Sequence, residues 1–576
     1  MWLQPWRIDT HNRNFQFSMN SNDLRRGFLN FFEKKGHKIV PSSSLIPTDL
    51  SCLFTTAGMQ QFKPYYLGEK SPYGKNVASC QKCFRTSDIE EVGNEKHLTF
   101  LEMLGNFSFG GYFKEEAIQL AFELVNSKFQ IPNSKIMVTV FGGDAEIPRD
   151  EESVRIWGKF GFSEKNGNLR FAGREDNFWG PTGEEGPCGP TTEIHFNGVE
   201  IWNLVFNEYY QDKNRKLTPL KQKGVDTGMG LERLAMVVQN KPSVFETDLF
   251  LSIINKIPGE NEKAKRVIAD HIKGSVFLIS EGIFPSNVER EYVLRRILRR
   301  AIRFGKLLNL PKNFLIPLAQ KVIEIYKDIY PEVKSKEADI LTVIQKEEEK
   351  FEKTLNLGLK QFEKISARGD ISGEEAFHLF DTYGFPLELT EELAKEKGLE
   401  VDIKGFEESF KKHREISRAG VEKKFGGVGK EAPYESAKLH TATHLLHAAL
   451  REILGTQVKQ MGSDITPQRL RFDFSHPQKM TEEELKKVEA IINQKIKEDL
   501  EVKKTEMPYQ GAIKSGALAF FKEKYPEVVT VYSIGVFSKE ICAGPHVKKT
   551  SELGRFKIIK EESSGAGVRR IRAILE

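Results

Sequence analysis

Residues 199–210, VEIWNLVFNEYY, form a short run of the residue types that favour β-strands. A second run of this kind, IMVTVFGG, occupies residues 136–143. From about Asn22 to about Phe250, such runs alternate with helical stretches and with many glycines. This mixture predicts an α+β domain that is built on an antiparallel sheet and carries its chemistry on loops.

The pattern changes twice toward the C-terminus. From about Ser252 to about Arg418 it is almost wholly helical, and KEEEKFEKTLNLGLKQFEKI at 346–365 is its clearest amphipathic segment. The Gly- and Lys-rich stretch SRAGVEKKFGGVGKEAP at 417–433 predicts a linker, after which a second α+β segment begins. We therefore expect an α+β multidomain protein with an N-terminal extension at 1–21, an α+β domain at 22–250, a helical domain at 251–424, a linker at 425–436 and a further α+β domain at 437–576.

The composition is that of an ordinary globular protein. Hydrophobic residues make up 39% of the 576 residues and charged residues 29%, and this length predicts two to four domains. The net charge of +5 permits a polyanionic partner without requiring one. Five cysteines in so long a chain do not form a disulfide framework, so we expect a reducing, cytoplasmic location.

No export or membrane segment is expected. No apolar run approaches the roughly 20 residues of a membrane span. The first residues, MWLQPWRIDTHNRNFQFS, are basic and contain two tryptophans, but they lack the apolar core of a signal peptide. They fit either a weak organellar presequence or an extension upstream of a true start at Met19.

One predicted helix carries an unusual density of arginine. In YVLRRILRRAIRFG at 292–305, apolar residues recur at helical spacing and leave the arginines on the opposite face. That face is either solvated or turned toward the phosphates of a nucleic acid, and the sequence alone favours neither. The arginines are Arg295, Arg296, Arg299, Arg300 and Arg303.

Four side chains have the spacing of a metal site. His440 and His444 lie four residues apart on a predicted helix, so both imidazoles project from one face. Cys542 and His546 are likewise four apart, in ICAGPHV. One thiolate and three imidazoles can surround a tetrahedral zinc ion, although chance also produces such spacings. Four protein ligands are typical of a structural site and an open position of a catalytic one, so the role of the metal stays open.

Three further residues raise the same question. His447 is expected to support one of the ligands or to lie at the surface. Cys80 and Cys83 form a CxxC pair, but no second pair of matching spacing follows it. We therefore interpret both cysteines as structural.

Residues 78–117, ASCQKCFRTSDIEEVGNEKHLTFLEMLGNFSFGGYFKEEA, resemble alanyl-tRNA synthetase, a family of class II aminoacyl-tRNA synthetases. The likeness continues in order through nearly the whole chain. It includes FTTAGMQQFKPYYLG (54–68), EDNFWGPTGEEGPCGPTTEI (175–194), VDTGMGLERLAMVVQ (225–239), RVIADHIKGSVFLISEGIFPSN (266–287), FDTYGFPLELT (380–390), HTATHLLHAALREILG (440–455) and SGAGVRRIRAI (564–574). The resemblance implies a class II catalytic domain with an antiparallel sheet and flanking helices, then a helical tRNA-recognition domain, then an α+β editing domain that contains zinc.

The resemblance also implies an ATP site. Arg85 matches the motif 2 arginine, which would hold the α-phosphate of ATP and the carboxylate of alanine. Arg233 matches the motif 3 arginine, which would grip the γ-phosphate. Gly228 and Gly230 would let the backbone approach the nucleotide closely.

Two further ATP contacts are expected in the stretch that follows motif 2. Phe100 would stack on adenine, although an aromatic residue in a strand more often belongs to the core. Glu102 would contact ATP or magnesium. ATP chemistry of this kind requires Mg²⁺.

The implied alanine pocket is small. Asp226 would pair with the ammonium group of alanine, and Trp179 and Asn203 would complete the pocket. Such a pocket excludes glycine only weakly, because one methyl group is worth about 1–3 kcal/mol, and serine also enters. The family removes these errors at a second site, whose zinc ligands match His440, His444, Cys542 and His546 and whose pocket includes Gln460.

For tRNA(Ala), the resemblance points to two readers of the acceptor stem. Asn287 and Asp381 match residues that read its G·U wobble pair, although each also fits a turn or cap residue. The arginine helix that begins after Asn287 is then placed for phosphate contacts, with Arg295, Arg296 and Arg299 as candidates.

The chain resembles a compact form of the family. It stops after the editing domain, without the C-terminal domain that in many relatives holds the tRNA elbow and aids dimerisation. Either the enzyme is naturally compact or the chain has been cut at this point. We expect a monomer with weakened tRNA affinity.

Three other functions compete with that of an alanyl-tRNA synthetase with an editing site. A freestanding deacylase would not need Arg85, Asp226 and Arg233. An RNA-binding relative with a dead catalytic site is disfavoured by the intact motif residues. A threonine-specific synthetase would need zinc in its aminoacylation site, and Asn203 and Asp226 fit alanine better.

Overall fold

The computed structural model describes residues 19–49, 52–413, 433–519, 527–565 and 567–576. The first 18 residues and positions 425–432 of the predicted linker lie outside the described residues. None of the described helices combines the length and the apolar character needed to cross a bilayer.

The chain divides into two compact units. Unit 1 consists of residues 1–364 and 379–392, and unit 2 consists of residues 365–378 and 393–576. Unit 1 contains all of the predicted segment 22–250, and unit 2 contains all of 437–576. The predicted helical segment 251–424 is shared between them.

Unit 1 is built on a mixed sheet, here called the large sheet, which has nine strands among the described residues. Its order is β1-β2-β3-β9-β8-β7-β4-β5, with β6 paired to β7. The strands are β1 (Lys38–Ile39), β2 (Asn76–Phe84), β3 (Phe100–Phe109), β4 (Ile136–Phe141), β5 (Leu169–Ala172), β6 (Phe178–Trp179), β7 (Gly186–Phe196), β8 (Val199–Gln211) and β9 (Leu217–Gly230).

The two β-rich runs of the sequence became strands β4 and β8, and the predicted antiparallel sheet is confirmed in the interior of the large sheet. The two outer pairs, β1–β2 and β4–β5, are parallel instead. A parallel pair needs a long crossover connection, and both of these pairs have one.

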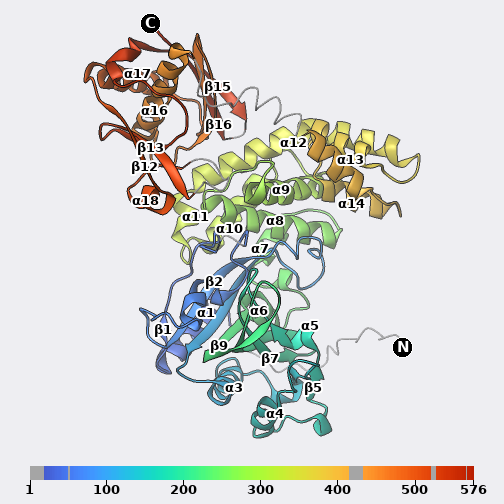
Figure 1. The fold of residues 1–576 in the computed structure, drawn as a ribbon. Coiled ribbons are helices and arrows are strands. Elements are labelled where there is room, and N and C mark those ends of the chain that lie inside the picture. Colours follow the sequence, from blue (N-terminus) through green and yellow to red (C-terminus); the bar gives the residue numbers. More distant parts are fainter. Residues whose placement is uncertain (1–18, 50–51, 414–432, 520–526, 566) are drawn as a thin grey trace. The chain divides into compact units, whose positions relative to one another are not determined.

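Helices cover the large sheet and continue into a helical segment (Figure 1). Helices α1 and α6 contact each other and β3, while α8 packs on both β3 and α9. Asn20 caps α1 by accepting from the N–H of Asp23, and Asn261 caps α8 by accepting from the N–H of Ala264. The helices are α1 (Ser21–Lys34), α2 (Lys63–Tyr66), α3 (Lys114–Glu123), α4 (Glu151–Gly158), α5 (Arg174–Asn177), α6 (Leu231–Val238), α7 (Leu251–Ile254), α8 (Glu262–Ser280), α9 (Glu289–Leu307), α10 (Leu315–Tyr326), α11 (Pro331–Ser335), α12 (Glu337–Ser366), α13 (Gly373–Tyr383) and α14 (Leu387–Glu396).

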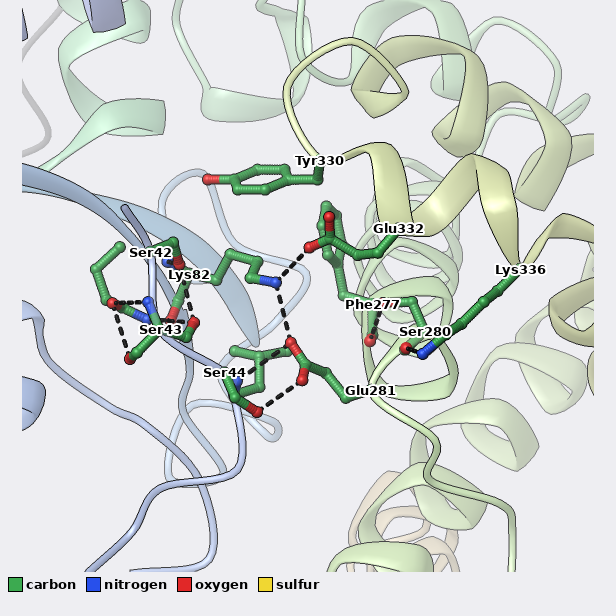
Figure 2. Close-up of polar contacts among 12 residues, drawn as sticks. Ser42, Ser43, Ser44, Lys82, Phe277, Ser280, Glu281, Tyr330, Glu332 and Lys336 are labelled. Carbon is green, nitrogen blue, oxygen red and sulfur yellow. Dashed lines mark hydrogen bonds and ion pairs between the residues drawn. The ribbon is translucent and has the colours of Figure 1, made fainter. Parts of the chain in front are cut away.

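The C-terminal end of α8 is fastened to the large sheet by ion pairs (Figure 2). Lys82 on β2 lies between two carboxylates, with its Nζ 2.9 Å from Glu281 Oε1 and 2.6 Å from Glu332 Oε1. Ser44 donates its hydroxyl to the other oxygen of Glu281 at 2.6 Å. The Lys82 side chain is 6% exposed, so these contacts hold an internal cation rather than a surface one.

Unit 2 contains two antiparallel sheets and, among its described residues after position 433, three α-helices, the first of which begins inside the predicted linker. The terminal sheet has the order β10-β11-β16-β15, and the small sheet has the order β12-β13-β14. Helix α16 packs on α17, β10, β11 and β14. The elements are α16 (Tyr434–Leu454), β10 (Gln460–Thr466), β11 (Arg469–Ser475), α17 (Glu482–Lys497), β12 (Val502–Pro508), α18 (Tyr509–Lys514), β13 (Val528–Ile534), β14 (Ser538–Ile541), β15 (Phe556–Gly565) and β16 (Val568–Leu575).

The helices of unit 2 are fixed locally and by a shared core. A capping box of Thr481 and Glu484 starts α17, and Gly455, at a φ of 104°, ends α16. Apolar side chains of α16 and α17 meet those of the terminal sheet, as at Leu445, Val488 and Phe472. This packing sets the rotation of α16 and therefore the direction in which its histidines point.

Candidate functional site

A cavity of about 320 Å³ opens on the large sheet. Seven of the predicted site residues line it, namely Arg85, Trp179, Asn203, Asp226, Gly228, Gly230 and Arg233. They come from different parts of the chain: Arg85 follows β2, Asn203 is on β8, and the last four lie on β9 or at the start of α6. The fold therefore gathers the predicted catalytic residues into one place.

Strand register explains how the polar residues meet. In the antiparallel pair β8–β9, Asn203 lies opposite Gly228 and Val205 lies opposite Asp226. At Gly228 a Cβ would lie 2.9 Å from the sulfur of Met103, which also lines the cavity, so the site has little room for a side chain there. β9 ends at Gly230 and α6 begins at Leu231, which brings Arg233 to the cavity within the first turn of the helix.

The cavity presents acceptors on one part of its wall and arginines on another. Asp226 is 5% exposed, and burial raises its pKa to about 8. Asn203 donates its amide to Glu193 Oε1 at 3.1 Å, and its own Oδ1 is buried without a hydrogen-bond partner among the described residues. Two acceptors in a desolvated position suit a ligand ammonium group.

The arginines have protein partners that a ligand could replace. Arg233 Nη1 contacts the carboxylate of Glu200 at 2.6 Å and its carbonyl oxygen at 3.2 Å. Arg85 Nε donates to the carbonyl of Thr56 at 3.3 Å. Both arginines line the cavity, where phosphate or carboxylate oxygens would give Arg85 a charge-assisted contact in place of a neutral one and would compete with Glu200 for Arg233.

Phe100 and Glu102 lie outside this cavity, and we assign them to the core instead of the predicted ATP contacts. Successive strand residues point to opposite faces, and Leu101 and Met103 are the β3 residues that line the cavity. Phe100 is fully buried, with its ring stacked on that of Phe277 at a centroid distance of 3.9 Å.

Glu102 is held on the same buried face as Phe100. It accepts hydrogen bonds from Arg25 Nε at 2.8 Å and from the Tyr330 hydroxyl at 2.9 Å. The period of two in FLEM could have identified Leu101 and Met103 as the cavity residues. No sequence pattern indicated Glu193 as a site residue, because its part in the site is the hydrogen bond that it accepts from Asn203.

Neither interpretation of the arginine helix describes Arg299 and Arg300. On α9 these side chains are neither solvated nor turned outward, since the two residues are 3% and 4% exposed. Arg299 Nε donates to Glu347 on α12 at 2.7 Å, and Arg300 pairs with Glu392 on α14 at 3.0 Å. The sequence correctly indicated the apolar face of α9. It did not indicate that glutamates of α12 and α14 pack against the arginine face.

The remaining predicted tRNA residues are more accessible. Asn287 is exposed before α9 and accepts a hydrogen bond from Arg295. Asp381 is exposed on α13. Arg296, partly exposed on α9, pairs with Glu90 and with Glu388.

Unit 2 brings the four predicted metal ligands together. The candidate ligand atoms of His440, His444, Cys542 and His546 all lie within 4.8 Å of one another. His440 and His444 project from α16, and the other two follow β14. His440 Nε2 is 3.4 Å from the sulfur of Cys542, and His546 Nε2 is buried without a hydrogen-bond partner among the described residues.

These donors fit a bound cation. Burial lowers the pKa of His440 to about 4, and burial also lowers the pKa of His546, so both imidazoles are neutral and keep a lone pair. Burial raises the pKa of the Cys542 thiol to about 11, and a metal ion would favour the thiolate instead. Three imidazoles and one thiolate are ligands that zinc accepts.

The second nitrogen of each histidine ligand faces an oxygen atom. Nδ1 of His440 is 3.2 Å from the Pro545 carbonyl, and Nδ1 of His546 is 3.1 Å from the Thr441 hydroxyl. Nδ1 of His444 is 3.5 Å from Glu540 Oε2. The contacts of His440 and His546 favour the ring proton on Nδ1 and leave Nε2 for the metal, whereas Nδ1 of His444 forms no hydrogen bond among the described residues.

Two positions were predicted for His447, one in support of a ligand and one at the surface. The structure places it in the interior, beside the cluster. It is fully buried, and its Nδ1 is 2.8 Å from Glu540 Oε1. Glu540 was missed by the sequence reasoning, although it lies two residues before Cys542, the spacing at which strand side chains share a face. Gln460 begins β10 and donates to Ser463 at 3.1 Å, and its place in an editing pocket stays a prediction.

Two family models match the chain. The family model described as tRNA synthetases class II (A) matches residues 23–199 and 197–463. The model described as Threonyl and Alanyl tRNA synthetase second additional domain matches residues 529–572.

Relatives resemble the chain over almost its whole length. An alanine–tRNA ligase from Borrelia hermsii is 47% identical over 593 residues, which span 97% of this chain and 100% of the relative. One from Treponema denticola is 48% identical over 606 residues, with the same shares of both chains. A longer one from Dehalococcoides mccartyi is 39% identical over 703 residues, which span 96% of this chain and 80% of the relative.

Proposed function

Because this chain belongs to the alanine–tRNA ligase family of class II aminoacyl-tRNA synthetases, we propose that the cavity on its large sheet activates alanine with ATP and passes it to the 3′ end of tRNA(Ala). We further propose that the histidine–cysteine cluster of unit 2 belongs to a site that hydrolyses Ser-tRNA(Ala) and Gly-tRNA(Ala). The observation that carries the first proposal is the convergence of Arg85, Asp226 and Arg233 on one cavity.

In the first half-reaction the carboxylate of alanine attacks the α-phosphorus of ATP and pyrophosphate leaves. Arg85 would bind the alanine carboxylate and the α-phosphate, because its planar guanidinium can meet both groups as negative charge builds on phosphorus. Arg233 would exchange Glu200 for the γ-phosphate and hold the departing pyrophosphate. The ATP would carry Mg²⁺, which neutralises part of the phosphate charge.

Alanine would be oriented by its ammonium group. Asp226 supplies the counter-charge, and Asn203 Oδ1 supplies a second acceptor whose direction Glu193 fixes. Trp179 lines the same cavity and would limit the space around the methyl group. Gly228 and Gly230 would leave the backbone of β9 open to the nucleotide.

A pocket of this kind supports the need for a second active site. It discriminates alanine from glycine by only about 1–3 kcal/mol, and serine differs by one added hydroxyl. His440, His444, Cys542 and His546 would hold zinc, which when bound would supply positive charge to the ester or its water. Gln460 would contribute to the same editing pocket.

Recognition of tRNA(Ala) is proposed for the helical segment 251–424. The exposed Asn287 and Asp381 would read the G·U pair of the acceptor stem from its minor groove. Arg295 and Arg296 are partly exposed and would contact phosphates, Arg296 by exchanging one of its partners Glu90 and Glu388, whereas Arg299 is internal. We propose a cytoplasmic monomer, with segment 22–250 for aminoacylation and 437–576 for editing.

Pyrophosphate exchange tests the proposed function. We expect ATP–pyrophosphate exchange to depend on alanine, with weaker signals for serine and glycine and none for threonine. Arg85→Ala should abolish exchange without unfolding the protein, because this side chain is partly exposed at the cavity. If none of the four amino acids supported exchange, the proposal would be contradicted, and a deacylase or an RNA-binding relative would be favoured.

A further inference from the structure

The loop between Arg85 and β3 is held by a buried carboxylate from the helical segment. Asp270 on α8 accepts the backbone N–H of Thr99 at 2.9 Å and the Thr99 hydroxyl at 2.6 Å. Both residues are fully buried. The carbonyl of Thr99 in turn accepts the backbone N–H of Arg85 at 2.8 Å. Asp270 thus reaches the backbone of Arg85 through a single intervening residue.

The same carboxylate is linked to helix α9. His271 Nε2 lies 3.0 Å from Arg300 Nη1, and because arginine only donates, this nitrogen must be the acceptor. The ring proton is therefore on Nδ1, which donates to Asp270 Oδ2 at 2.9 Å. Arg300 Nη1 also donates to the carbonyl of Ile89 at 2.8 Å, inside the loop that follows Arg85.

Other side chains of α8 and α9 grip the same loop. Arg266 donates to the carbonyl of Gly93 at 3.3 Å and to Glu95 at 3.1 Å, and Arg296 pairs with Glu90. Helix α8 is itself fixed at its C-terminal end by Glu281 and Lys82 (Figure 2). Asp270 therefore lies on a helix that cannot shift without breaking the contacts of Arg266 and Glu281.

We propose that Asp270 is a positioning residue for adenylate formation: it fixes Thr99, and thereby Arg85, against the reacting phosphate, and through His271 this placement depends on Arg300 of α9. The inference rests on the proposed function, because it assigns Asp270 a part in the same reaction. Asp270 touches neither ATP nor alanine; it acts on Arg85 through Thr99. Helix α9 begins just after Asn287, so the helical segment proposed to bind tRNA would also hold the residue that stabilises the reacting phosphate.

The test is steady-state pyrophosphate exchange by the full chain with Asp270→Asn, Thr99→Val, Thr99→Ser, Arg300→Lys and the double variant Asp270→Asn/Thr99→Val. The asparagine in Asp270→Asn keeps the shape of the side chain but lacks the charge that accepts three donors. We expect this variant to lower kcat by about 10- to 100-fold, because a small displacement of a catalytic group has effects of that size. The KM for alanine should change less than kcat, because the proposed contacts of its ammonium group are on β8 and β9 and only its carboxylate would contact Arg85.

Three comparisons separate positioning from mere stability. Thr99→Val should lower kcat in the same sense, whereas Thr99→Ser, which keeps the hydroxyl, should restore it. The double variant should be no slower than Asp270→Asn, because both changes break one linkage. Arg300→Lys should lower kcat as well, since lysine is shorter and lacks the planar fork that contacts His271, Ile89 and Glu392 together. Asp328→Asn makes the same chemical change at an exposed position of the helical segment and should behave as wild type.

Wild-type kcat in Asp270→Asn, additive losses in the double variant, or a loss that only tracks the unfolded fraction in a thermal melt would each overturn the inference. No alanine-dependent exchange by the wild-type chain would instead overturn the proposed function itself.

Discussion

Asp226 shows how one residue can couple substrate binding to a proton. Its side chain is buried at the cavity, and burial raises its pKa to about 8. In the empty cavity the protonated acid is therefore favoured at neutral pH. A ligand ammonium group would stabilise the carboxylate, so the proposed binding of alanine would be linked to loss of this proton.

The linkage predicts a pH dependence. As pH falls from 8 to 6, we expect the KM for alanine in pyrophosphate exchange to rise, because a proton must leave Asp226 before the ammonium group can pair with it. Asp226→Asn should remove this dependence and weaken alanine binding at every pH by about 2–5 kcal/mol. A wild-type KM that stays constant across this range would contradict the assignment.

Gly228 offers a second test within the cavity. A Cβ there would lie 2.9 Å from the sulfur of Met103, so Gly228→Ala should push Met103 toward the substrate. We expect a higher KM for alanine, equivalent to about 1–3 kcal/mol. Adding Met103→Ala should recover most of the loss in the same exchange assay. A double variant no better than Gly228→Ala would show that the backbone, and not Met103, is disturbed.

At the residue scale, the sequence identified which positions matter more securely than which way they point. Arg85, Asn203, Asp226 and Arg233 all reached the cavity as expected. Phe100 did not, because strand alternation turns it toward Phe277. Motif matching assigns positions, whereas the direction of a side chain depends on the pleat and on what packs behind it.

At the scale of elements, the helix α9 separates what a single sequence can predict from what it cannot. The apolar spacing correctly predicted a helix with a buried stripe, now seen at Leu294, Ile297 and Leu298. The environment of the arginines depends on Glu347 and Glu392, which are far away in the sequence. Helical periodicity carries no information about such a partner.

This arrangement predicts that Arg299 stabilises the fold instead of binding RNA. Arg299 and Glu347 are each 3% exposed, so Arg299→Met should leave the buried Glu347 carboxylate with only the longer, 3.7 Å contact to Arg295 and lower the free energy of unfolding by about 3–5 kcal/mol. Urea denaturation measures this loss, and Arg299→Met/Glu347→Leu should restore part of it. The salt dependence of tRNA binding should not change; a slope reduced by about one would instead indicate a phosphate contact.

The pairing of α16 with β14 predicts a role for Glu540 in metal binding. Glu540 lies beside the Nδ1 atoms of His444 and His447 and helps to orient His444. We expect Glu540→Gln to weaken zinc binding by about 10- to 100-fold in a chelator competition. Glu506→Gln, on the exposed strand β12 of the same small sheet, is the matched control. Equal affinities in the two variants would contradict this role.

For the whole molecule, the two sites should be separable by mutation. The cavity lies in unit 1 and the histidine–cysteine cluster lies in unit 2. Cys542→Ser should lose the metal and the hydrolysis of Ser-tRNA(Ala) while leaving alanine-dependent exchange intact, and Cys52→Ser should lose neither. Metal analysis and a deacylation assay on the same preparation check both halves of the expectation. Loss of exchange together with the metal would show that the units are not independent.

The separation of the two units along the chain also sets the order in which they are made. Glu392, the last residue of unit 1, precedes the ligand His546 by 154 residues. At about 5–20 residues per second, the ribosome needs roughly 8–30 s to cover that distance. A nascent chain therefore contains every residue of the cavity on the large sheet well before it contains all four residues of the histidine–cysteine cluster. Translation that stalls and is aborted in this interval would release a chain that contains the proposed aminoacylation cavity but lacks the complete histidine–cysteine cluster.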